Sequence, residues 1–127
     1  MLMADAAAAL RETRRVLRAD GRVACAVFAG PEQNPWAALP SRVLQERGHI
    51  PPPGARAPGI LALADRDRLR RLFTEAGFSD PAIEEVAFAF RFAGMDEYWE
   101  FLNGAAGAIA MVLRRLGEDE RERFAVR

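Results

Sequence analysis

Hydrophobic and polar positions follow a helical period at the start of the chain and then change to a continuous apolar run. One face is formed by residues three and four apart, namely Leu10, Thr13, Val16 and Leu17, and arginines lie on the opposite face. The pair Asp20–Gly21 is typical of a tight turn. The run VACAVFA that follows is apolar on both faces, which favours a central strand covered on both sides of a sheet. We therefore predict a helix over about 5–18 and a strand over about 22–29.

The rest of the chain carries further helix signals and one strand signal. Asn34 is a good helix N-cap before a proline, and Gly77 stands where a left-handed C-cap residue belongs. Between Val86 and Phe92 apolar residues alternate with small or charged ones, which is the period of a strand with a buried Phe-rich face. The pattern predicts helices over about 35–47, 65–76, 96–116 and 118–126, and a second strand over about 82–92.

Length, charge and composition limit the kinds of protein that this chain can be. A chain of 127 residues is one domain's worth, so we expect a single domain over 1–127. The 18 basic and 18 acidic side chains balance, which gives no reason to expect nucleic acid or an anionic membrane as a partner. No apolar run approaches membrane-spanning length and no signal peptide is evident. These features predict a cytoplasmic protein that binds neither nucleic acid nor membrane.

Three phrases give the chain a family resemblance. AALRETRRVLRADGRVACAVFAG (8–30) is similar to the late helix and fifth strand of S-adenosylmethionine-dependent methyltransferases with the Rossmann-like fold. LFTEAGF (72–78) resembles the end of the helix before their sixth strand, and MDEYW (95–99) resembles the opening of the helical insertion that follows. The resemblance is to small-molecule methyltransferases of the kind found in ubiquinone and menaquinone biosynthesis. It implies an α/β fold: a partial Rossmann-like domain, helix-rich, with two main strands.

The resemblance covers only the C-terminal half of that family's domain. The family binds S-adenosylmethionine with a glycine-rich turn after its first strand and an acidic residue after its second. No G-x-G-x-G occurs in this chain. We therefore expect no cofactor-binding residue here and no cofactor bound by this chain alone. The chain is predicted to be a truncated, substrate-side portion of a methyltransferase that is inactive by itself.

Candidate site residues come from the resemblance alone. Asn34, Trp36 and Tyr98 are the residues expected nearest to a pocket for a small-molecule methyl acceptor. The alternative is that they are a helix cap, a core aromatic and an aromatic at a helix start, respectively. No catalytic residue is assigned. His49 is a candidate base or a solvated loop residue, and Cys25 is expected to be a small buried hydrophobe. The pattern of His, Cys, Asp and Glu offers no metal-ligand set.

The lack of the family's N-terminal half in this chain also leads us to expect a partner. In the family, the strand that 22–29 resembles is hydrogen-bonded to the fourth and seventh strands, and this chain has neither. Its backbone groups must pair elsewhere, so we expect a homodimer or a complementary N-terminal half. Two other functions stay open: a non-enzymatic dimeric α/β domain that binds a partner protein or an apolar ligand, and a small enzyme built on a dimeric barrel.

Overall fold

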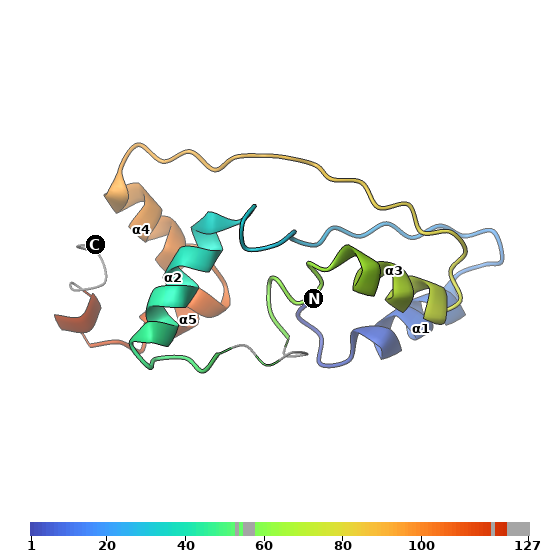
Figure 1. The fold of residues 1–127 in the computed structure, drawn as a ribbon, viewed down its shortest axis with the longest axis horizontal. Helices are drawn as coiled ribbons and strands as arrows, with labels where there is room; N and C mark the ends of the chain where they lie inside the picture. The colour runs from blue at the N-terminus through green and yellow to red at the C-terminus, as the bar shows by residue number, and fades with distance from the viewer. Residues whose placement is uncertain (53, 55–57, 118, 122–127) are drawn as a thin grey trace. The chain divides into compact units, whose positions relative to one another are not determined.

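The structure is a computed structural model that describes residues 1–52, 54, 58–117 and 119–121. Its elements are helical, as Figure 1 shows. The helices of the described residues are α1 (Ala6–Val16), α2 (Pro35–Glu46), α3 (Arg66–Glu75), α4 (Met95–Gly104) and α5 (Ala108–Leu113). They belong to two compact units, one made of Met1–Asn34 with Pro53–Val86 and the other of Pro35–Pro52 with Ala87–Arg127.

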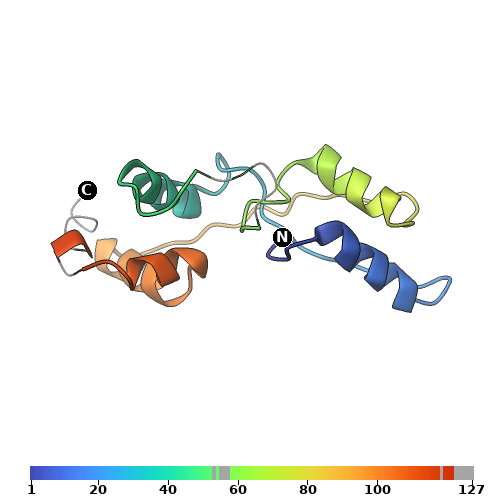
Figure 2. The ribbon, with the colours of Figure 1, turned by 90° about the horizontal axis from the view of Figure 1, so that it is seen from below.

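In the first unit α1 packs against α3, and the two helices lie side by side in Figures 1 and 2. Each begins at an aspartate whose carboxylate accepts a backbone N–H, Asp5 from Ala8 at 2.8 Å and Asp65 from Arg68 at 2.7 Å. Gly77 follows α3 with φ 88°, the left-handed conformation that glycine adopts most readily. The predicted C-cap is therefore confirmed.

An extended segment follows each of these two helices. Residues 22–29 come after α1, residues 79–86 come after α3, and each segment runs back along the helix before it (Figure 1). Arg66 at the start of α3 holds the second segment: its guanidinium pairs with the Glu85 carboxylate at 2.6 Å and donates to the Ile83 carbonyl at 3.0 Å. The second segment is thus fixed to its helix by side chains and not by a sheet.

In the second unit α5 packs against both α2 and α4. Leu44, Leu102 and Leu113, one from each helix, are the largest fully buried side chains of the described residues. Three leucines from three helices form the centre of this core, because each helix turns one apolar stripe toward the others.

The predicted fold class is wrong. The described residues contain no β-strand, so the α/β sheet with two main strands, over about 22–29 and 82–92, is not formed. Both stretches are extended, as their apolar and alternating patterns indicate, but residues 22–27 and 79–92 make no main-chain to main-chain hydrogen bond within the described chain. A strand requires a hydrogen-bonded neighbour, and local sequence cannot supply one.

The long helix predicted over 96–116 is also wrong as a single element. It is two helices, α4 and α5, separated at Ala105–Gly107, and Gly107 has φ 53°. The chain turns there because two glycines in four residues weaken the helix and one of them, Gly107, adopts a positive φ that disfavours other residues.

The remaining helix predictions differ in outcome. The helices over 5–18, 35–47 and 65–76 are confirmed as α1, α2 and α3 to within two residues at each end. Of the helix over 118–126, residues 118 and 122–126 lie outside the described residues, and 119–121 are helical. A single domain over 1–127 stays a prediction.

Candidate functional site

Asn34 is the polar residue that lies buried just before α2. Its exposed fraction is 7%, and its side-chain amide donates to the carbonyls of Ala29 at 3.0 Å and Gly30 at 3.1 Å. Its own backbone N–H donates to the Pro31 carbonyl at 3.2 Å. Asn34 therefore closes the turn that ends the first extended segment, and its amide hydrogens are directed at the chain itself.

Trp36 and Tyr98 meet through a hydrogen bond between two helices. The Tyr98 hydroxyl in the first turn of α4 donates to the Trp36 carbonyl in α2 at 2.8 Å. In an α-helix that carbonyl would accept the N–H of the residue four positions later. That residue is Pro40, which has no N–H. Tyr98 thus supplies a donor that the sequence of α2 itself lacks.

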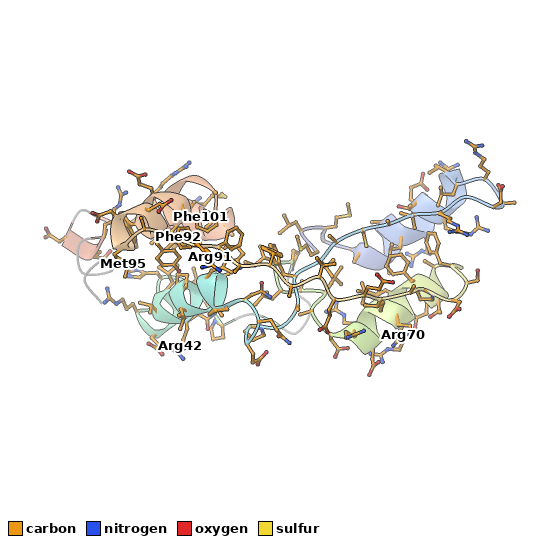
Figure 3. The ribbon with its side chains drawn as sticks, turned by 90° about the horizontal axis from the view of Figure 1, so that it is seen from above. Arg42, Arg70, Arg91, Phe92, Met95 and Phe101 are labelled. Atoms are coloured by element: carbon orange, nitrogen blue, oxygen red, sulfur yellow. The ribbon has the colours of Figure 1, made fainter. Side chains whose placement is uncertain are left out.

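An aromatic cluster surrounds this hydrogen bond. The Trp36 ring meets Phe90 and Phe101 edge to face, with centroids 5.3 Å and 5.6 Å apart. Phe92 packs on Tyr98 at 5.2 Å and on Phe101 at 5.3 Å, and Figure 3 shows Phe92 beside Phe101. Such pairs stabilise a fold by about 0.5–1.5 kcal/mol each beyond area burial. The cluster packs Phe90 and Phe92 onto α2 and α4 within the second unit.

Burial changes the chemistry of Tyr98. Because the phenol is partly desolvated, its pKa lies above the ordinary value of 10.0. The phenol therefore stays protonated at neutral pH and acts as a hydrogen-bond donor. Its proton is directed at a backbone carbonyl, and this geometry makes Tyr98 a structural donor between two helices.

The structure brings together two of the three predicted acceptor residues. Trp36 and Tyr98 share a hydrogen bond and a ring cluster, whereas Asn34 belongs to the other compact unit. Sequence reasoning missed Phe101, which contacts three other aromatic rings of the cluster. Its position three residues after Tyr98 in the same helix was the signal, because residues at that spacing share a helical face.

The predicted Phe-rich core face is only partly buried. Phe92 is half-buried, but Val86, Phe88 and Phe90 are exposed. The prediction failed for these three because alternation identifies a face and cannot identify what covers it. Packing by α2 and α4 covers the far end of the segment only.

His49 and Cys25 have surroundings that differ from the predictions. The His49 side chain is 19% exposed, and its Nε2 lies 3.9 Å from Glu120 Oε1, so it is not a fully solvated loop residue. Cys25 is exposed, and the prediction of a buried hydrophobe is wrong. Among the described residues no group of three or more His, Cys, Asp or Glu is placed to hold a metal ion.

The chain was compared with protein families, curated proteins and solved structures. No family model, no curated protein and no solved structure matches the chain. Across the residues that the structure describes, no helix has both the length and the apolar character needed to cross a membrane.

Proposed function

We propose that this chain is the substrate-side C-terminal portion of a Rossmann-like S-adenosylmethionine-dependent methyltransferase, and that it works in the cytoplasm as part of a larger assembly. Support comes first from sequence: the phrases at 8–30, 72–78 and 95–99 occur in the order in which that family has them. In this proposal the cofactor is bound by another polypeptide, which supplies the glycine-rich turn and the acidic residue.

One structural observation carries the proposal furthest. The segment that resembles a central strand, 22–29, is extended, and residues 22–27 have no main-chain partner within the described chain. Unpaired N–H and C=O groups along an apolar segment favour pairing with another chain. A complementary N-terminal half would bring the strand that pairs with this edge in the family.

Trp36 and Tyr98 have a supporting role in this proposal. Their hydrogen bond and ring contacts give a rigid aromatic wall beside the start of α4. An aromatic wall suits an apolar small-molecule methyl acceptor, because methyl transfer depends on how closely the acceptor and the sulfonium methyl are aligned. In this proposal Asn34 does not contact the acceptor, and its hydrogen bonds hold the turn that precedes α2.

The test is a calorimetric titration with S-adenosylhomocysteine. The chain alone is expected to give no heat of binding. A mixture of the chain with a polypeptide that comprises the first to fourth strands of a small-molecule methyltransferase is expected to bind more tightly than that polypeptide alone. Micromolar binding by the chain alone, or no gain from mixing, would contradict the proposal.

A second candidate rests on different residues. The exposed Val86 and Phe88 favour the non-enzymatic alternative, a dimeric domain that binds a partner protein or an apolar ligand. Adding a cofactor-binding polypeptide distinguishes the two functions. The methyltransferase proposal predicts that the chain then forms a complex that binds S-adenosylhomocysteine more tightly. The alternative predicts that the oligomeric state and the ligand binding of the chain stay the same.

A further inference from the structure

The extended chain that follows α3 continues to residue 91, and residues 85–91 have a main chain that is open to pairing. Residues 85–91 (EVAFAFR) are extended and make no main-chain to main-chain hydrogen bond within the described part of the chain. A row of free N–H and C=O groups is a template for another strand. This segment is distinct from residues 22–29, on which the proposed function rests.

All seven residues of this segment are exposed. Val86 is 83% exposed and Phe88 is 66% exposed. Arg91, labelled in Figure 3, is exposed and has no ion-pair partner among the described residues. At the other end of the segment Glu85 has an exposed side chain too. The segment thus carries an apolar centre, a carboxylate at one end and an unpaired guanidinium at the other.

We propose that this segment pairs with the same segment of a second copy of the chain, antiparallel and centred on Phe88. In this register Phe88 faces Phe88 of the other copy. Val86 faces Phe90, Ala87 faces Ala89, and Glu85 faces Arg91, each pair occurring twice. The residues at 86, 88 and 90 share one face, and the residues at 85, 87, 89 and 91 share the other. Two copies of the segment therefore match each other: apolar residues face apolar residues, and each Glu85 faces an Arg91.

Other antiparallel registers lose this complementarity. Centring the pair on Ala87 places Glu84 opposite Phe90, and centring it on Ala89 places Arg91 opposite Ala87. A shift by one residue brings the Phe face of one copy against the small and charged face of the other. Centring on Ala89 still pairs Phe88 with Phe90, but it leaves neither Glu85 nor Arg91 opposite a charge of the other sign. The Phe88-centred register places Glu85 opposite Arg91 twice, and opposite charges directly across an antiparallel pair stabilise it, so this register is favoured.

The pairing preserves the contacts that the segment makes within one chain. Strand pairing uses the edge of the main chain, so Phe90 keeps its ring contacts with Trp36 and Phe101. The Glu85 carboxylate has two oxygens, and Arg66 is bound to one of them. The other oxygen is available to Arg91 of the second copy. Each segment finds its hydrogen-bonded neighbour in the other copy, so the pairing requires no β-sheet within a single chain.

Charge reversal tests the register by analytical ultracentrifugation. The unmodified chain is expected to dimerise at micromolar concentration. Glu85→Arg alone and Arg91→Glu alone each create two like-charge pairs and are expected to raise the dimer dissociation constant about tenfold or more. An equimolar mixture of the two variants restores both opposite-charge pairs and is expected to dimerise as the unmodified chain does.

The mixture provides the decisive comparison. Two misfolded variants would not rescue each other, and circular dichroism of each variant shows whether its helices remain. Val16→Lys is the matched control for Phe88→Lys, because Val16 is equally exposed on α1. The control is expected to leave the dimer intact, whereas Phe88→Lys dissociates it. A monomeric unmodified chain, or a mixture that stays monomeric, would overturn the proposal.

A disulfide trap checks the centre of the register. In a Cys25→Ala background, Phe88→Cys places two thiols directly opposite each other, within the distance a disulfide requires. Ala82→Cys is the control, since its two copies would be separated by roughly 40 Å in this register. Rapid oxidative cross-linking at 88 and none at 82 is expected. Equal cross-linking at both positions would contradict the register.

Discussion

The Tyr98 hydroxyl donates to the Trp36 carbonyl at 2.8 Å, at the position where α2 cannot supply its own donor. Pro40 lies four residues after Trp36 and lacks the N–H that would complete the helical hydrogen bond. A proline buried inside α2 is therefore compensated from α4, and the two helices are linked by the polar group of an otherwise aromatic cluster.

A double-mutant cycle tests this compensation. Tyr98→Phe removes the donor and is expected to lower the free energy of unfolding by about 1–3 kcal/mol, because the hydrogen bond from Tyr98 to the Trp36 carbonyl is lost. In a Pro40→Ala background the helix can donate to Trp36 itself, so the same change is expected to cost less. The measurement is chemical denaturation of all four variants. Equal costs in both backgrounds would show that the two residues act independently.

The pH dependence of stability follows from the Tyr98 pKa. Burial raises the pKa above 10.0 in the folded chain, so the unfolded chain loses this proton first as the pH rises. The contribution of Tyr98 to stability is expected to be constant below about pH 10 and to be lost as the pH rises from there through the folded pKa. Tyr98 is the single tyrosine, so phenolate absorbance reports its titration directly. Tyr98→Phe should remove this part of the decline; an unchanged decline would assign it to other groups.

The Asn34 amide is expected to stabilise the turn before α2. Asn34→Ala removes hydrogen bonds to the carbonyls of Ala29 and Gly30 and should lower the free energy of unfolding by about 1–3 kcal/mol. Gln33→Ala is the matched control, because Gln33 is a neighbouring exposed amide. If Asn34 serves only an acceptor pocket, both variants would unfold at the same denaturant concentration.

The leucine core of the second unit should respond strongly to truncation. Leu102→Ala leaves a cavity in a fully buried position and is expected to lower the free energy of unfolding by about 2–5 kcal/mol. Leu39→Ala, at a position 50% exposed in α2, is the control and should cost much less. Thermal melting followed by circular dichroism compares them. Similar losses would mean that α2, α4 and α5 do not share one core.

The two glycines at the break between α4 and α5 are expected to behave in opposite ways. Neither has an atom within 4 Å of the Cβ that alanine would add, so space does not separate them. Gly107→Ala should destabilise the chain by about 1 kcal/mol, because its φ of 53° disfavours a side chain. Gly104→Ala should be neutral or stabilising by up to about 1 kcal/mol, because it lies within α4. Equal effects in denaturation would contradict the positive φ at Gly107.

Much of the local structure of this protein could be predicted from residues that are close together in the chain. Apolar spacing and end signals such as Asp65 and Gly77 predicted α1, α2 and α3 closely, since caps and amphipathic faces depend on residues a few positions apart. The extended conformation of 22–29 and 82–92 was also evident, since apolar runs and alternation disfavour helix.

The contacts between those elements could not be predicted from the sequence pattern. Whether an extended segment becomes a strand depends on a hydrogen-bonded neighbour distant in sequence, and the described chain gives 22–27 and 79–92 none. The link from Tyr98 to Trp36 spans 62 residues, and the exposure of Phe88 depends on what packs beside it. Such relationships follow from how distant segments meet, and a pattern along the chain contains no information about that meeting.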